Sequence, residues 1–214
     1  MQAILLKTLR DIVSPWVLVF VLKAALLALV ATGAVLWAIK PMLLQYTQRY
    51  IAMIPWEWLQ SVGVKVAFLA MGYMLFIFFL SMAVSLLIEP LLKRLALKHY
   101  GIEATGEPQI VTSVGLSVKS GLAFLLLFMV TFPLMFVPLV GAIYLLYLWS
   151  IPLNAPSRYD VEALFALPAP KGMRARLIAM AAAAFNYLPV LNVFAPVFAE
   201  IAFMHAALRD VKPS

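Results

Sequence analysis

The chain has 214 residues, of which 65% are hydrophobic and only 12% are charged, and its net charge is +7. Its mean hydropathy is +1.03, whereas soluble domains are nearer half apolar and a quarter charged. A soluble core of this size cannot hide so much apolar surface, so the composition excludes an ordinary soluble protein and indicates helices in contact with lipid. The sequence has no cysteine, which excludes disulfides and Cys-ligated zinc. Its basic residues are scattered among loops, so we expect anionic lipid and no nucleic acid as partners.

Two apolar blocks in the first half of the chain are long enough to cross a bilayer. The first runs from Trp16 to Ile39 and is broken only by Lys23, and the second runs from Val66 to Ile88 without a charge. Each spans a hydrocarbon core of about 30 Å at about 1.5 Å per residue. We therefore predict one helix at about 16–39 and a second at about 64–88 that extends to 100.

Prolines mark the expected ends of these helices. Pro15 suits the first turn of helix one, where its missing N–H is harmless. Pro41 is expected to end that helix, and Pro90 to bend or end helix two. Between them, 42–63 carries aromatic residues typical of the headgroup level, namely Tyr46, Tyr50, Trp56 and Trp58.

The second half of the chain contains two further apolar blocks that prolines interrupt. The third block has no charge between Lys119 and Arg158. A straight helix cannot hold Pro133 and Pro138 without losing backbone hydrogen bonds that lipid cannot replace. The fourth block, Leu177–Leu208, contains Asn186, Pro189, Asn192 and Pro196. We predict hairpin one at about 113–152 and hairpin two at about 172–208.

The predicted fold class is an all-α integral membrane protein in a single domain over 1–214. It combines two long transmembrane helices with two proline-broken helical hairpins that partly penetrate the membrane. In this topology most Lys and Arg residues fall on one side, and only Lys40, Arg49 and Lys65 on the other. The positive-inside rule then places both termini in the cytoplasm. Arms of roughly 14 residues reach only about 21 Å, which favours half-crossing hairpins over full crossings.

Residues 91–100 are expected to form a basic amphipathic helix. Leu91, Leu92, Leu95 and Ala96 share one face, and Lys93, Arg94 and Lys98 lie on the opposite arc. Such helices lie on anionic lipid. Gly101 suits the residue that follows the last helical turn.

Several stretches, taken in order, resemble the EI24/CysZ family of membrane proteins, whose bacterial branch includes sulfate permeases. They are Leu-Arg-Asp-Ile-Val-Ser-Pro at 9–15, Phe-Val-Pro-Leu-Val-Gly at 136–141, Ser-Arg-Tyr-Asp at 157–160 and Leu-Pro-Val-Leu-Asn-Val-Phe-Ala-Pro-Val-Phe-Ala at 188–199. The resemblance implies two long transmembrane helices, two partly inserted hairpins, a homo-oligomer and, in the permease branch, sulfate uptake. One stretch departs from the family: its sulfate permeases carry Gly-Leu-Arg just after the helix-one proline, whereas here Trp16-Val17-Leu18 follows Pro15.

Six polar residues in or near the apolar blocks are candidates for substrate contact or gating. Lys23 marks a functional site unless its stem reaches the interface or helix one starts later. Glu200 either pairs with Lys23 or a loop arginine, or faces headgroups. Asn186 and Asn192 either contact a permeating ion or cap helix ends.

The other two candidates, Arg158 and Asp160, fall in an expected cytoplasmic loop. They either gate or bind an anion, or form an ion pair in which Asp160 caps a short helix through Leu164.

No residue pattern indicates catalysis. His99 and His205 are far apart and lack acidic or histidine neighbours at ligand spacing, so we expect no metal site. The sequence has no Gly-rich phosphate loop and no Ser/His/Asp set, so we expect no cofactor and no enzyme. The leading hypothesis is a CysZ-like permease or channel for a small anion such as sulfate. The alternative is a non-transporting EI24-type protein that organises lipids or protein partners.

Overall fold

The computed structural model is helical wherever it has regular secondary structure. It describes the backbone of all residues except 52–56, 132, 133, 135, 136, 138, 189, 210 and 212–214. The α-helices are α1 Gln2–Ile12, α2 Pro15–Ile51, α3 Glu57–Leu87, α4 Glu89–Tyr100, α5 Ile110–Thr131, α6 Val140–Phe165, α7 Gly172–Ala183 and α8 Ala195–Leu208. Two short 3-10 helices, η2 Ala184–Tyr187 and η3 Leu191–Phe194, separate α7 from α8.

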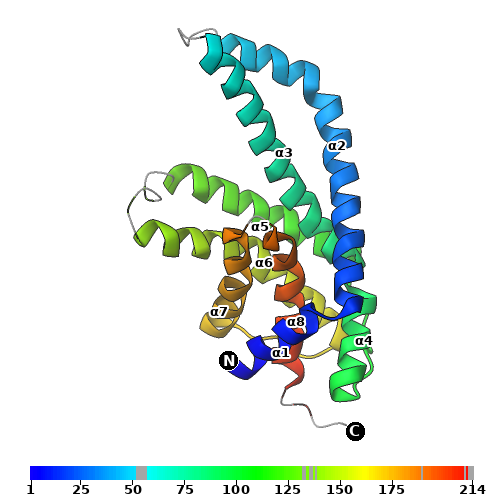
Figure 1. The fold of residues 1–214 in the computed structure, drawn as a ribbon. Coiled ribbons are helices and arrows are strands. Elements are labelled where there is room, and N and C mark those ends of the chain that lie inside the picture. The colour runs from blue at the N-terminus through cyan, green and yellow to red at the C-terminus, as the bar shows by residue number, and fades with distance from the viewer. Residues whose placement is uncertain are drawn as a thin grey trace.

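The two long helices α2 and α3 lie side by side and extend away from the rest of the molecule (Figure 1). α2 begins at Pro15, as expected, but Pro41 does not end it: the helix has 37 residues and runs on to Ile51. A proline removes one backbone donor and kinks a helix rather than stopping it when the following turns can pair again. The aromatic side chains expected at the interface, at 46, 50, 56 and 58, lie outside the described residues.

The junction of α3 and α4 confirms the bend expected at Pro90. α3 ends at Leu87, α4 starts at Glu89, and the two helices meet at 57°. Pro90 occupies the first turn of α4, where it needs no donor. Gly101 follows α4 with a φ of 66°, the left-handed conformation that glycine adopts without strain.

The apolar face of α4 packs on protein, which corrects the expectation that it lies on lipid. Its members Leu91, Leu92, Leu95 and Ala96 are all buried, and they belong to one core cluster with residues of α2, α3 and α8. The opposite face of α4 stays exposed, with Arg94 and Lys98 on it. This face is buried because α8 offers an apolar surface of its own. The periodicity of α4 shows that the helix has an apolar face but does not show whether lipid or another helix covers it.

The third apolar block is divided as predicted, but its second arm is longer than expected. α5 ends at Thr131 and α6 begins at Val140, and the two helices run side by side (Figure 1). α6 does not stop at 152: Pro152 and Pro156 lie inside it, and it continues to Phe165. Residues expected in a loop, including Asp160, are therefore helical. How deeply this pair enters a bilayer stays a prediction.

The fourth block is broken over 184–194, and its second arm forms the centre of the molecule. Pro196 lies in the first turn of α8, and nearly every residue of α8 is buried. The alanine-rich segment of α7 packs closely, because Ala179, Ala182 and Ala183 are fully buried. An unpredicted N-terminal helix, α1, also packs against α8.

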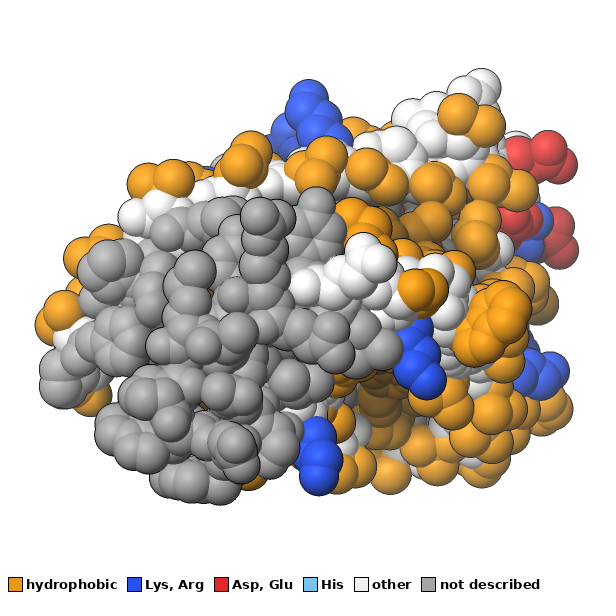
Figure 2. All heavy atoms as spheres, turned by 90° about the horizontal axis from the view of Figure 1, so that it is seen from above, with side chains coloured by type: hydrophobic (Ala, Val, Ile, Leu, Met, Phe, Trp, Pro, Cys, Tyr) orange, Lys and Arg blue, Asp and Glu red, His pale blue; other side chains and the backbone are white. Residues whose placement is uncertain are grey.

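Outside this core, α2 and α5 expose apolar side chains that suit lipid. Among the described residues, three helical segments are long and apolar enough to span a bilayer: Pro15–Met42, Ile110–Phe128 and Leu191–Leu208. The bent pair of α3 and α4 would add a fourth. Seen from above, the described surface is mostly hydrophobic, with a few separate Lys and Arg side chains (Figure 2). The chain is therefore an all-helical membrane protein.

Replacing a buried residue of α4 tests whether the apolar face of this helix packs on the protein core. Leu92 has no exposed surface, so Leu92→Ala should lower the free energy of unfolding by about 2–5 kcal/mol through the cavity it leaves. Leu97, on the same helix, is 55% exposed, and Leu97→Ala should change that free energy by about 0.5 kcal/mol or less. Unfolding in detergent micelles by added SDS, followed by circular dichroism, gives both values. Equal losses would show that α4 does not pack on the core through Leu92.

Candidate functional site

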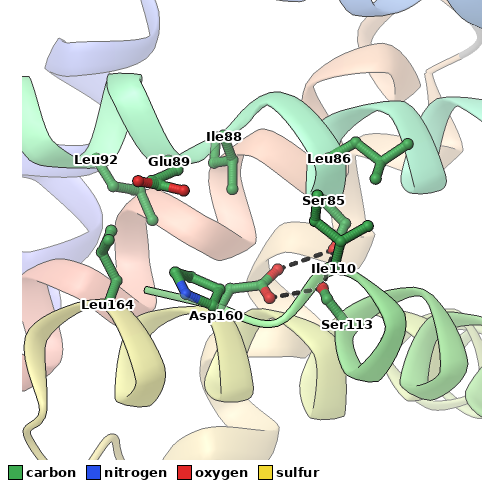
Figure 3. A pocket seen from close by; sticks show the side chains of 10 residues that line it. Ser85, Leu86, Ile88, Glu89, Leu92, Ile110, Ser113, Asp160 and Leu164 are labelled. Atoms are coloured by element: carbon green, nitrogen blue, oxygen red, sulfur yellow. Dashed lines mark hydrogen bonds between the residues drawn. The ribbon is translucent and has the colours of Figure 1, made fainter. Parts of the chain in front are cut away.

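A buried cluster of one carboxyl group and two hydroxyl groups lies where α3, α5 and α6 meet (Figure 3). Ser85 comes from the last turn of α3, Ser113 from the first turn of α5 and Asp160 from the C-terminal part of α6. The Ser85 Oγ donates to Asp160 Oδ2 at 2.9 Å, and the Ser113 Oγ donates to Asp160 Oδ1 at 2.6 Å. The two serine oxygens are themselves only 2.5 Å apart. Asp160 is 1% exposed, so these hydroxyls replace the water that it loses on folding.

The number of hydrogens in the cluster bears on the charge of Asp160. The two serines and Asp160 make three mutual contacts, and each contact needs one hydrogen to be a hydrogen bond. If Asp160 is ionised, only the two serine hydroxyls carry a hydrogen, so one contact lacks one. A protonated Asp160 supplies a third hydrogen. One of the two serine–carboxyl contacts then runs from Asp160 to the serine, and each group donates once and accepts once around a closed ring. This neutral arrangement also suits a buried position, where an isolated charge is expensive. The geometry therefore favours a cluster that holds a proton.

A second carboxyl group adjoins the first. Glu200 of α8 is 2% exposed, and it interacts with Asp160 and with Ser157 of α6. Burial raises the pKa of Asp160 above its ordinary value of 3.8, against the opposing effect of its hydrogen bonds with Ser113, Ser85 and Glu200. Two neighbouring buried carboxyls repel each other if both are ionised, and protonation of one of them removes this repulsion. The Glu200 Oε2 atom is buried and makes no hydrogen bond within the described part of the chain.

A small cavity of about 60 Å³ opens beside the cluster. Ser85, Ser113 and Asp160 line it on one side and Glu89 on another (Figure 3), and Pro108 also belongs to its wall. This volume exceeds the roughly 10–15 Å³ that one water molecule needs, and the polar wall offers such a molecule partners. Water in the cavity would join the buried carboxyl to the acidic side chain at the start of α4.

The loop between α4 and α5 is held against α6 next to this cavity. The Gly106 N–H donates to the carbonyl oxygen of Leu164 at 3.0 Å. A side chain at Gly106 would place its Cβ 1.9 Å from the carbonyl oxygen of Ala163, so only glycine permits this close approach. The backbone N–H of Gln109 donates to the Tyr159 hydroxyl at 3.3 Å.

The structure brings together two of the six residues singled out in the sequence, Asp160 and Glu200. Neither makes the contact that the sequence suggested. Asp160 lies inside α6 rather than capping a short helix, because α6 runs through to Phe165. Arg158 instead approaches Glu162, with its Nε 3.7 Å from Glu162 Oε1, a pair spaced one helical turn apart. Glu200 contacts Asp160 rather than Lys23 or a loop arginine.

The other three candidates lie apart from the cluster. Lys23 is exposed on α2. Asn192 is buried in η3, and its side-chain amide donates to the Tyr73 hydroxyl of α3 rather than capping a helix. Asn186 lies in η2 and is half-buried. These positions assign Asn192 to fixing the 184–194 turn against α3.

Ser85 and Ser113 complete the cluster, but no pattern in the sequence marks them as site residues. Both lie in strongly apolar stretches, where a serine commonly bonds to its own helix, as Ser81 and Ser117 do here. No spacing in the sequence links positions 85, 113 and 160, because three separate helices carry them. The sequence held one weak indication: an aspartate close to an apolar block needs polar partners, which other helices must then supply.

A second feature lies at the beginning of α2. The guanidinium carbon of Arg94, from α4, lies 3.4 Å from the centre of the Trp16 ring. Arginine stacks on indole faces through cation–π attraction while its N–H groups remain free at the edges. The sequence has no arginine just after Pro15, and in the structure Arg94 of α4 stacks on the side chain of Trp16 there.

These observations define the class of the protein: a multi-helix membrane protein with a buried carboxyl pair in its core and an arginine stacked on a tryptophan in the first turn of its first long helix. The family model described as Sulfate transporter CysZ/Etoposide-induced protein 2.4 matches residues 4–196. The chain therefore belongs to the EI24/CysZ family, which confirms the resemblance seen in its motifs. Comparisons with curated proteins and with solved structures found no match.

Removing one donor of the cluster tests its energetics. Ser113→Ala leaves Asp160 Oδ1 without its hydroxyl and should lower the free energy of unfolding by about 1–3 kcal/mol. The pKa of Asp160 is higher in the folded protein than its ordinary value of 3.8. The contribution of Asp160 to the free energy of unfolding is therefore fully present below pH 3.8 and is lost as pH rises through the pKa of the folded state. The Ser113 hydroxyl stabilises the ionised form of Asp160. The loss of unfolding free energy in Ser113→Ala should therefore grow as pH rises.

The matched control is Ser117→Ala, on the same helix, which loses only a bond to the Ser113 carbonyl. Unfolding measured in detergent at several pH values separates the two variants. A pH-independent deficit for Ser113→Ala, equal to that of the control, would contradict the role assigned to Ser113.

Proposed function

We propose that this chain is a permease for a small inorganic anion such as sulfate in a bacterial inner membrane, with both termini in the cytoplasm. We further propose that the buried Asp160–Glu200 pair carries a proton together with the anion. The description of the matching family model, which names a sulfate transporter, supports the choice of substrate. The observation that carries the proposal is the position of Arg94 at the start of α2.

The start of α2 has the donors that an oxyanion requires. The first N–H groups of a helix lack partners within it, and the helix dipole makes this end partly positive. The backbone N–H groups of Trp16 and Val17 fall in this first turn, whereas Pro15 has none. The Oγ of Ser14, just before the helix, is buried and makes no hydrogen bond to the described residues. Arg94, which stacks on the Trp16 side chain of this turn, adds a full positive charge and a planar set of donors.

Proton coupling follows from the chemistry of the carboxyl pair. Sulfate carries two negative charges, so its inward movement is opposed by an inside-negative membrane potential. Carrying protons with the anion offsets that charge. A buried carboxyl pair that retains a proton, beside a cavity large enough for water, is the type of group that relays protons in membrane transporters.

Anion binding is tested by substituting the arginine. Uptake of labelled sulfate into proteoliposomes should occur with the wild-type protein and fall by roughly tenfold or more in Arg94→Gln, since a charge-assisted contact contributes about 1.5–3 kcal/mol. Lys98→Gln removes another exposed positive charge from the same helix and should leave uptake unchanged. Equal uptake by wild type and Arg94→Gln would refute the anion site.

Absence of uptake by the wild-type protein would refute sulfate transport if a known sulfate permease is active in the same vesicles. That result would favour the alternative, in which the protein organises lipids or partners through its membrane surface. The exposed apolar side chains along α2, which include Leu22, Leu29, Val30 and Trp37, provide such a surface for lipid or for a second copy of the chain.

Proton coupling is tested by Asp160→Asn. Wild-type uptake should increase when the medium outside the vesicles is acidified, whereas uptake by Asp160→Asn should no longer respond to the pH gradient. The control Glu103→Gln replaces an exposed carboxylate in the loop after α4 and should respond like wild type. A gradient response that survives in Asp160→Asn would show that this carboxyl does not carry the coupled proton.

A further inference from the structure

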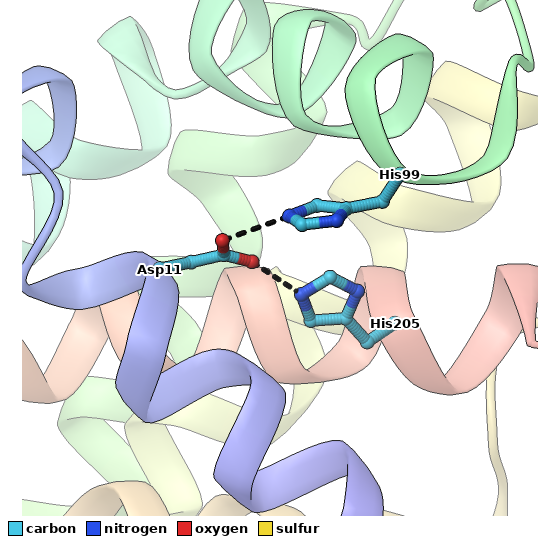
Figure 4. A group of neighbouring side chains, drawn as sticks. All are labelled: Asp11, His99 and His205. Atoms are coloured by element: carbon cyan, nitrogen blue, oxygen red, sulfur yellow. Dashed lines mark hydrogen bonds and ion pairs between the residues drawn. The ribbon is translucent and has the colours of Figure 1, made fainter.

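A second buried polar cluster joins α1, α4 and α8 at the base of the molecule (Figure 4). Asp11 lies in the last turn of α1, and its two carboxylate oxygens point at two different histidines. The Nε2 of His99, from α4, lies 2.8 Å from Asp11 Oδ1. The Nε2 of His205, from α8, lies 2.8 Å from Asp11 Oδ2. Asp11 and His205 are buried, and His99 is partly exposed.

A metal site was not expected from the sequence, and these contacts remove the reason for that expectation. In the sequence, His99 and His205 lack acidic or histidine neighbours at ligand spacing. In the structure they share one carboxylate, and the ligand atoms of all three residues lie within 4.8 Å of one another. The sequence contains two histidines in all, and both are in this cluster.

We propose that Asp11, His99 and His205 form a binding site for one divalent transition-metal ion of the zinc class. Two imidazole nitrogens and one carboxylate oxygen are a common ligand set for such ions, with a further position left for water. Mg²⁺ and Ca²⁺ prefer oxygen ligands and fit this set poorly. The site goes beyond the proposed transport function, which makes no use of these residues.

The geometry requires only small movements. Tetrahedral coordination with metal–ligand distances of about 2.0–2.2 Å separates the ligand atoms by about 3.3 Å. Each Nε2 now lies 2.8 Å from a different oxygen of Asp11, and the ligand atoms of the three residues lie within 4.8 Å of one another, so modest shifts toward a common centre bring them to this separation. The three ligands come from three helices that already pack together, so the ion would meet a largely preformed site.

The second nitrogen of His205 is already held by a partner. The Tyr100 hydroxyl lies 3.0 Å from His205 Nδ1. Ligation through Nε2 requires the proton on Nδ1, and a tyrosine hydroxyl accepts from that N–H as readily as it donates to a bare nitrogen. Tyr100 therefore satisfies His205 with and without a metal ion, and it fixes the orientation of the ring.

The position of Lys7 and the exposure of His99 are compatible with a bound cation. The Lys7 Nζ lies 4.0 Å from the centre of the Tyr100 ring, so this charge is engaged with an aromatic face while the imidazoles hold Asp11. The His99 side chain is 20% exposed, whereas that of His205 is fully buried. An ion would therefore approach from the His99 side of the cluster, where water can also fill the remaining coordination position.

The alternative is a cluster held by hydrogen bonds alone, in which the two histidines neutralise Asp11 without any ion. The two cases differ in what the purified protein binds. A ligand cluster takes up about one Zn²⁺ or Co²⁺ per chain, and tetrahedral Co²⁺ gives intense visible absorption. The sequence contains no cysteine and no other histidine, so nitrogen ligation of Co²⁺ in an untagged chain reports on this site alone.

The experiment uses the full-length protein with any affinity tag removed, treated with a chelator and titrated with Co²⁺ and Zn²⁺ in detergent. We expect about one ion per chain and a tetrahedral Co²⁺ spectrum. His99→Gln and Asp11→Asn should abolish both, and Tyr100→Phe should weaken binding by roughly 10–100-fold, as loss of a partner behind a metal ligand does. Glu103→Gln, which removes a nearby exposed carboxylate, should bind like wild type.

A wild-type chain that shows no Co²⁺ spectrum and no Zn²⁺ uptake overturns the proposal. So does a His99→Gln variant that binds as wild type does. His99 is partly exposed, so its substitution should leave the fold intact, as circular dichroism would verify. If Asp11→Asn fails to fold, the wild-type spectrum and the His99→Gln comparison still decide the question.

Discussion

Helix α8 is so deeply buried that its two polar residues must find partners inside the protein, and this constraint organises the rest of the structure. Glu200 meets Asp160 of α6, and His205 meets Asp11 of α1 together with Tyr100 of α4. An unpaired polar group in a lipid-surrounded core is expensive, since neither water nor lipid can satisfy it. The two contacts therefore fix three other helices around α8, in addition to the apolar packing.

The same constraint explains why the two polar clusters differ in character. Around Asp160 the partners are hydroxyl groups and a second carboxyl, so the cluster is satisfied best when it holds a proton. Around Asp11 the partners are imidazoles, which stabilise an ionised carboxylate and also supply metal ligands. Each cluster joins helices that are distant in sequence, so a change in its protonation or ligation would bear on how those helices pack.

The long helices have a separate role. α2 and α3 extend away from the core and expose apolar side chains along their length, as a lipid-facing pair does (Figure 1). Their lower ends nevertheless belong to the site: Ser85 lies in the last turn of α3, and Trp16 at the start of α2 carries Arg94 on its ring. A change in the tilt of this pair would therefore move both the carboxyl cluster and the arginine.

The sequence alone determined that this chain is a helical membrane protein, where its apolar blocks break, and which family it resembles. These features are local: they depend on apolar length, on prolines that lack a donor, and on short ordered motifs. Only the tertiary structure decided that α2 passes Pro41, that α6 carries Asp160 to the core, and that the apolar face of α4 is covered by protein. It also decided the pairing of Asp160 with Ser85 and Ser113, and of Asp11 with two histidines. The physical reason is that each pairing joins residues on different helices, and the spacing of residues along the chain says nothing about which helix faces lie opposite one another.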